Sequence, residues 1–141
     1  MKRLVIDSSI IVKWLHQQEE RYLDNADKII KDANIGDAIL ITSELAKYEI
    51  GNALLLSKKV PLEDAKVSFE SLYLLPIQFI VQSEDEAREA YRIAYEKKIT
   101  YYDASFMALA LRQDAILVTD NPKHQDKKIR GLKVISLKNY R

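Results

Sequence analysis

The stretch RLVIDSS, residues 3 to 9, decides how the rest of the chain is interpreted. Its three consecutive apolar residues, 4 to 6, have the length and the branched side chains of a buried strand. A carboxylate, Asp7, and two hydroxyls, Ser8 and Ser9, follow at once. An acid in this place lies at the edge of a sheet, where it either caps the next helix or belongs to a functional site.

Similar apolar runs recur along the chain and alternate with helical patterns. The expected strands are Leu4–Ile6, Ala38–Thr42, Ile77–Val81, Ala115–Thr119 and Lys133–Ile135. The expected helices are one that starts near Ser8, Tyr22–Ala33, Ser43–Lys58 with Ser43 as its N-cap, Leu62–Leu74, Ser83–Lys97 and Asp103–Gln113. This alternation predicts an α/β fold, with a mostly parallel central sheet between two helical layers.

Length and composition indicate one globular domain over residues 1–141. The chain has 48% hydrophobic and 30% charged residues, and 22 basic residues against 21 acidic ones give a net charge of +1. This total provides no long-range attraction to nucleic acids or anionic membranes, so any such role must be local. The absence of cysteine excludes disulfides and thiolate metal sites, and it suits the cytoplasm. Asp7 and Lys13 interrupt the first apolar run, so we expect no membrane segment.

Acids follow or border several of these elements. Asp7 comes after the first strand, Asp120 after AILVT, and Asp103 stands where a helix begins. Glu49 and Asn52 lie one turn apart on the helix that follows the second strand, and so share a face. Because the carboxyl ends of parallel strands meet at one edge of a sheet, we expect a shared acidic site there.

Each acid also has a simpler explanation that stays open. Asp7 and Asp103 are both in positions where aspartate commonly caps a helix. Glu49 is of a type that usually faces solvent, and Asp120 precedes Asn121 and a proline in a turn-forming sequence.

A shared acidic site has a definite chemistry. Converging carboxylates repel one another, and a divalent cation relieves that repulsion. Mg²⁺ and Mn²⁺ prefer such oxygen ligands and promote hydrolysis of phosphodiesters. His16 and His124 are too few and too far apart in sequence to indicate a zinc site.

The segment PKHQDKKIRGLK, residues 122 to 133, follows the expected site and is basic. Lys123, Lys127, Lys128 and Arg130 could contact an RNA backbone, because phosphates are bound mainly by lysine and arginine. A solvated loop before the last strand is the alternative explanation.

Four motifs in this order resemble the PIN-domain ribonucleases, and most of all the VapC toxins of prokaryotic toxin–antitoxin pairs. They are VIDSS (5–9), YEIGNAL (48–54), YYDASFMALA (101–110) and LVTDN (117–121), and the resemblance extends from Leu4 to Ile135. It implies a PIN-like α/β/α fold and a metal-dependent endoribonuclease that uses Mg²⁺ or Mn²⁺. The implied metal-binding acids are Asp7, Glu49 and Asp103, supported by Ser9, Asn52 and Thr119.

The resemblance also implies partners. RNA is the implied substrate, a VapB-like antitoxin the implied inhibitor, and a homodimer the implied assembly. We expect a C-terminal antitoxin segment to occupy a groove lined by Tyr22–Ala33 and Ser43–Lys58, with a basic residue set against the acids.

The fourth acidic position departs from the family pattern. That acid usually falls two residues after the threonine, where this chain has Asn121, while Asp120 stands one residue early. An extended backbone after Thr119 would direct Asn121 into the site, whereas a turn at Asp120 would direct Asp120 there. We favour Asp120, because a fourth carboxylate neutralises divalent cations better.

Two other kinds of protein remain as alternatives. The displaced acid is compatible with a non-catalytic PIN-fold module that binds RNA or protein. A phosphorylation-receiver-like domain would need an acceptor aspartate after the middle strand, and IQFIV leads to Gln82 and Ser83 instead.

Overall fold

The structure is a computed structural model that describes residues 1–121 and 128–141. Its strands are β1 (Lys2–Ile6), β2 (Ala38–Ser43), β3 (Ile77–Ile80), β4 (Ile116–Thr119) and β5 (Val134–Ser136). Its helices are α1 (Ser8–Leu15), α2 (Leu23–Asn34), α3 (Leu45–Asn52), α4 (Leu62–Leu74), α5 (Glu84–Lys97) and α6 (Tyr101–Arg112). A π-helical turn, η1 (Ala53–Ser57), extends α3, and a 3₁₀ turn, η2 (Leu137–Asn139), follows β5.

The five strands form one parallel sheet in the order β3-β2-β1-β4-β5. Strand β1 is central, and its register pairs Val5 with Ile41 of β2 and Ile6 with Val118 of β4. The carboxyl ends of β1, β2 and β4 therefore lie side by side, which confirms the expected α/β architecture and brings Asp7 next to Thr119.

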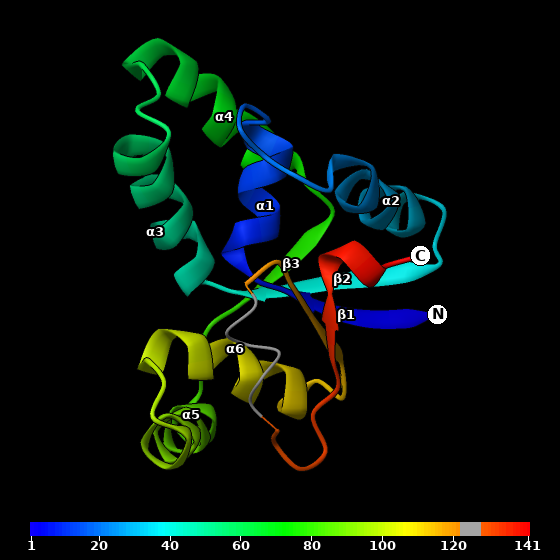
Figure 1. Cartoon of the computed structure of the whole chain (residues 1–141), viewed down its shortest axis with the longest axis vertical. Helices are drawn as coiled ribbons and strands as arrows, with labels where there is room; N and C mark the ends of the chain where they lie inside the picture. Colours follow the sequence, from blue (N-terminus) through cyan, green and yellow to red (C-terminus); the bar gives the residue numbers. More distant parts are fainter. Residues whose placement is uncertain (122–127) are drawn as a thin grey trace.

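Helices cover both faces of the sheet (Figure 1). Helices α1 to α4 lie on one face, and α5 and α6 pack together on the other. Leu4, Val5 and Ile6 are fully buried, because a central parallel strand is covered on both faces and needs apolar side chains in succession. Phe106 and Met107 of α6 complete the core beneath the sheet.

Two helix starts differ from the sequence expectation. Ser43 is not an N-cap: it is the last residue of β2, and its hydroxyl accepts a hydrogen bond from the Leu45 amide at 3.1 Å. Helix α6 begins two residues before Asp103, because the Thr100 hydroxyl caps it by accepting from the Asp103 amide at 3.1 Å. The Ser83 hydroxyl caps α5 by accepting a hydrogen bond from the Glu86 amide at 3.2 Å.

The amino end of β1 is joined to the end of the chain by a buried aspartate. Asp32 of α2 is 1% exposed, and it accepts hydrogen bonds from the Tyr140 hydroxyl at 2.7 Å and from the ammonium groups of Lys2 and Lys28. The two termini lie close together in Figure 1, as these contacts require. In the described parts of the chain, no helix combines the length and the hydrophobicity needed to cross a bilayer.

Candidate functional site

Asp7 occupies the junction between β1 and α1. Its backbone is extended at the N-cap position, but its carboxylate makes no capping hydrogen bond, so capping by this side chain is wrong. The carboxylate instead accepts hydrogen bonds from the hydroxyls of Ser9 and Thr119. At 3% exposure, Asp7 is held between the first turn of α1 and the end of β4.

Glu49 of α3 reaches the same turn of α1 from the other side. The Ser8 hydroxyl donates a hydrogen bond to Glu49 Oε1 at 3.1 Å. Ser8 and Ser9 are adjacent, so one turn of helix orients the carboxylates of Glu49 and Asp7. The serines of RLVIDSS therefore position acids that are far apart in sequence.

A cleft of about 460 Å³ lies between α3 and α6, and Glu49 forms part of its wall. Asn52, one turn further along α3, lines the same cleft, and Tyr102 contributes from α6. Asp103 follows Tyr102 in the first turn of α6, where a negative charge interacts favourably with the helix dipole. Since Thr100 caps α6, capping does not explain Asp103.

The backbone bends at Asp120 instead of continuing as an extended strand. The Asn121 amide donates to the Thr119 hydroxyl at 3.0 Å, and the Asp120 amide donates to the Ser9 hydroxyl at 3.4 Å. These bonds favour the turn over the extended alternative. The Asp120 carboxylate meets Lys13 of α1, with 2.9 Å between Oδ2 and Nζ.

Lys13 is a functional candidate that the sequence analysis missed. It is only 2% exposed, and its ammonium also pairs with Glu20 at 2.8 Å. Burial by itself would lower the pKa of Lys13, but hydrogen bonds to Glu20 and Asp120 and their negative charges outweigh it and raise the pKa. A sequence signal existed: Lys13 lies three residues after Ile10, on the buried face of α1.

Only part of the basic segment can be placed. Lys123 and Lys127 lie outside the described residues, whereas Lys128 and Arg130 are exposed. Exposure at these two positions is compatible both with RNA contact and with a solvated loop.

Oxygen atoms make up the donor set at this sheet edge. Hydroxyl groups hold the carboxylates of Asp7 and Glu49, and oxygen is the donor type that Mg²⁺ and Mn²⁺ prefer. Among residues 1–121 and 128–141, no three His, Cys, Asp or Glu side chains are arranged so that they could hold a metal ion. The donor atoms are therefore of the type that a hard divalent cation prefers, but within the described chain they do not form a complete set of ligands around one point.

The PIN-domain family model matches residues 4–129. The chain belongs to the PIN-domain family. This membership, together with the strand order, excludes the receiver-like alternative. A search of curated protein sequences finds no match.

Solved PIN-fold structures are similar to this one throughout. Against VapBC2 from Rickettsia felis, bound to a DNA fragment from its promoter, the TM-score is 0.69, with 18% identity over 95% of this chain and 98% of the other. Against FitAcB from Neisseria gonorrhoeae, the TM-score is 0.66, with 16% identity over 96% of this chain and 99% of the other. Against VapC20 from Mycobacterium tuberculosis, described as a sarcin–ricin loop cleaving toxin, the TM-score is 0.63, with 12% identity over 86% of this chain and 92% of the other. At these identities the similarity shows the fold.

Proposed function

We propose that this PIN-domain protein is a Mg²⁺- or Mn²⁺-dependent endoribonuclease of the cytoplasm and the toxin of a type II toxin–antitoxin pair. The observation that carries the proposal is the convergence of Asp7 and Glu49 on adjacent serines, at the edge of a PIN-domain sheet. Two carboxylates held this way, one of them in the wall of an open cleft, suit cation-assisted hydrolysis better than they suit fold stability alone.

The chain's own residues would have distinct roles. Asp7, Glu49 and Asp103 would close around the cation when it binds, since the described part of the structure does not hold three acids in that arrangement beforehand. The hydroxyls of Ser9 and Thr119 would orient Asp7. When bound, the cation would neutralise charge on the scissile phosphate and activate water. In the reaction, the water oxygen bonds to phosphorus, one ester P–O bond breaks, the released oxygen gains a proton and the water loses one.

The proposal also includes the fourth acidic position of the site, after Thr119. Asp120 would supply the fourth carboxylate, and Lys13 would fix it through Oδ2 while offsetting part of its charge. Asn121 would contribute a neutral amide next to it. The Lys13 pair lowers the net negative charge available to a second cation, which favours a site with one tightly held ion.

The ion pair between Lys13 and Asp120 also supports a second candidate function. If Lys13 withdraws Asp120 from the site entirely, the domain could bind RNA or a protein without cutting RNA. Such a module would cleave nothing with any divalent cation, which separates it from the nuclease.

An antitoxin is the proposed protein partner, and a homodimer the proposed assembly. Similar solved structures include VapBC2 from Rickettsia felis and a toxin–antitoxin complex from Klebsiella pneumoniae. Exposed large apolar side chains are frequent on η1 and α4, and they provide surface for such partners: Leu55, Leu56, Leu62, Val67, Phe69, Tyr73 and Leu74. Helix α1 contacts both α2 and α3, so it lies between the walls of the expected antitoxin groove.

The purified protein, incubated with single-stranded RNA, tests the nuclease proposal. We expect cleavage with Mg²⁺ or Mn²⁺ and none with excess chelator. Glu70→Gln, a change to an exposed acid on α4, is the control and should cleave normally. Intact RNA at every Mg²⁺ and Mn²⁺ concentration, with the protein folded by circular dichroism, would contradict the proposal.

A further inference from the structure

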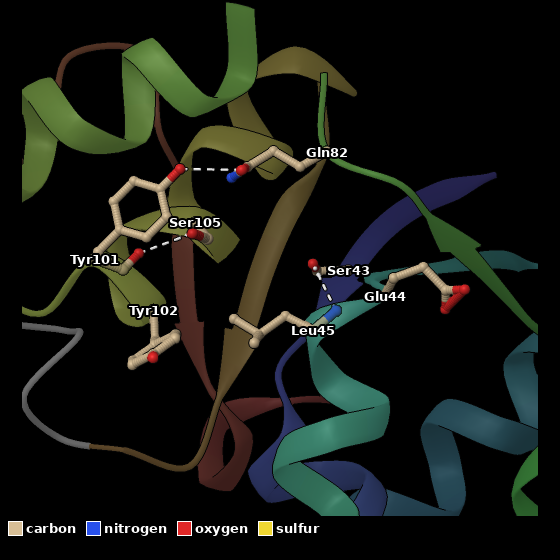
Figure 2. Close-up of a pocket in the computed structure, with 7 residues that line it drawn as sticks. All are labelled: Ser43, Glu44, Leu45, Gln82, Tyr101, Tyr102 and Ser105. Atoms are coloured by element: carbon tan, nitrogen blue, oxygen red, sulfur yellow. Dashed lines mark hydrogen bonds between the residues drawn. The ribbon is translucent and has the colours of Figure 1, made fainter. Parts of the chain in front are cut away.

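A second pocket of about 160 Å³ lies beside the candidate cleft, between the ends of β2 and β3 and the start of α6 (Figure 2). Ser43 ends β2, and Gln82 follows β3 by two residues. Figure 2 shows Gln82 at one end of the pocket, and Tyr102 and Leu45 at the other. The pocket therefore opens at the same sheet edge as Asp7 and Glu49.

The two tyrosines of α6 give the pocket an aromatic wall. The Tyr101 hydroxyl donates to Gln82 Oε1 at 3.0 Å, which ties α6 to the segment after β3. Tyr102 is 58% exposed, so its ring is accessible to a planar ligand. Flat π-systems such as nucleobases stack on exposed tyrosine rings.

Polar groups complete the pocket. The Gln82 oxygen is used by Tyr101, and within the described residues no acceptor is found for the Gln82 amide N–H groups. The Ser43 oxygen accepts from the Leu45 amide, so its own O–H can donate outward. These two donors match the carbonyl oxygens of a base such as uracil or guanine.

Among residues 1–121 and 128–141, one acid lines the pocket, Glu44, and it is turned away from the tyrosines. Figure 2 shows the Glu44 side chain directed away from Tyr101 and Tyr102. Its carboxylate pairs with Lys47 at 2.8 Å. This arrangement keeps negative charge away from the space that a nucleotide would occupy.

The pocket also shares residues with the candidate cleft. Leu45 and Tyr102 line both, and the cleft contains Glu49 and Asn52. A strand whose phosphate lies beside Glu49 would thus pass directly over Tyr102. The next base along that strand would reach the pocket without further rearrangement.

We infer that this pocket binds one unpaired nucleobase of the RNA, next to the phosphate that is cut, with Tyr102 stacking on the base and Gln82 and Ser43 contacting its edge. The inference rests on the proposed function and extends it to base selection. Single-stranded RNA fits because only unstacked bases can turn into such a pocket.

Binding of fluorescently labelled homopolymeric RNA oligonucleotides, with chelator present, tests the inference without any cleavage. The wild-type protein should bind U or G oligomers more tightly than A or C oligomers. Tyr102→Ala should weaken binding about 5- to 100-fold, the range for loss of one stacked base. Gln82→Ala should reduce the base preference, and it provides a separate test in case Tyr102→Ala does not fold. The control is Tyr95→Ala, which removes an exposed tyrosine on α5 and should change neither the affinity for RNA nor the base preference.

The outcomes separate this inference from the nuclease proposal. If the protein cuts no RNA but binds it with a base preference that Gln82→Ala removes, the pocket is supported and the nuclease proposal fails. If the protein cuts RNA, while Tyr102→Ala and Gln82→Ala keep wild-type affinity, preference and cut positions, the pocket inference is overturned.

Discussion

The two ends of β1 each place a buried aspartate beside the strand, in different surroundings. At the carboxyl end, Asp7 accepts hydrogen bonds from the hydroxyls of Ser9 and Thr119. At the amino end, Asp32 is bound by the ammonium groups of Lys2 and Lys28 and by the Tyr140 hydroxyl.

These contacts explain why equal burial supports different roles. Hydrogen bonds from Lys28 and Tyr140 lower the pKa of Asp32 to about 2, despite the opposing effect of burial. Burial, together with the negative charge of Asp32, raises the pKa of Tyr140. The cluster joins α2, β1 and the end of the chain, so Asp32 stabilises the fold. Asp7 instead shares a turn of α1 with Glu49, which lines the candidate cleft.

The largest expected effect is on RNA cleavage. It comes from comparing the same isosteric change, aspartate to asparagine, at the two ends of β1. Asp7→Asn should lower RNA cleavage on the order of 100- to 1000-fold, because several kcal/mol of charge stabilisation at the phosphate would be lost. Asp32→Asn should leave the cleavage rate per folded molecule near that of the wild type. Initial rates on single-stranded RNA, with folding checked by circular dichroism, provide the measurement. Equal losses in both variants would remove the distinction between the two ends.

Removal of Lys13 should destabilise the carboxyl end of the sheet. Lys13→Met keeps the side-chain length but leaves Glu20 and Asp120 without this cation, so we expect a loss of about 2 kcal/mol in the free energy of unfolding. Urea denaturation with chelator present measures it. The control is Lys66→Met, which removes an exposed ion pair between Lys66 and Glu63 on α4. It should lower the free energy of unfolding by less than about 0.5 kcal/mol. A Lys13→Met variant as stable as this control would show that the buried network is not structural.

The amino end should respond to Asp32→Ala by loss of stability alone. Tyr140 would lose its buried acceptor, while Lys2 and Lys28 could turn to solvent, so we expect about 1–2 kcal/mol of destabilisation. Denaturant unfolding near neutral pH measures this change. Asp27→Ala, at an exposed position of the same helix, is the control, and equal stability of the two variants would contradict the role given to the cluster.

The smallest expected effect is a pH dependence that comes from Asp32. Its pKa is about 2 in the folded protein against 3.8 ordinarily, so its ionised form favours folding above about pH 4. That contribution should fall away as the pH drops from about 4 to about 2, by roughly 1 kcal/mol after allowance for screening. Unfolding of the wild type and Asp32→Asn across this range isolates the effect. Parallel stability curves for the two proteins would show that Asp32 is not responsible.

The amino-acid sequence was enough to predict the α/β fold and to assign several acids to the ends of particular strands and helices. Each strand is a short apolar run and each helix a periodic one, and such patterns are local properties of the chain. Asp7 follows β1 in sequence, so a parallel sheet places it at the carboxyl edge of the strands whatever its neighbours. Helix starts were less predictable, since a hydroxyl earlier in the chain can cap a helix and start it sooner, as Thr100 does three residues before Asp103 in α6.

The partner of each acid became known from the three-dimensional contacts alone. The contact between Asp7 and Thr119 spans 112 residues, and no local pattern specifies it. The same holds for Asp120, because a bend at the end of β4 directs its carboxylate to Lys13, a lysine that its sequence neighbours do not mark as a partner. Contacts of this kind depend on how helices pack across a sheet, where a shift of a few ångströms exchanges one ion pair for another.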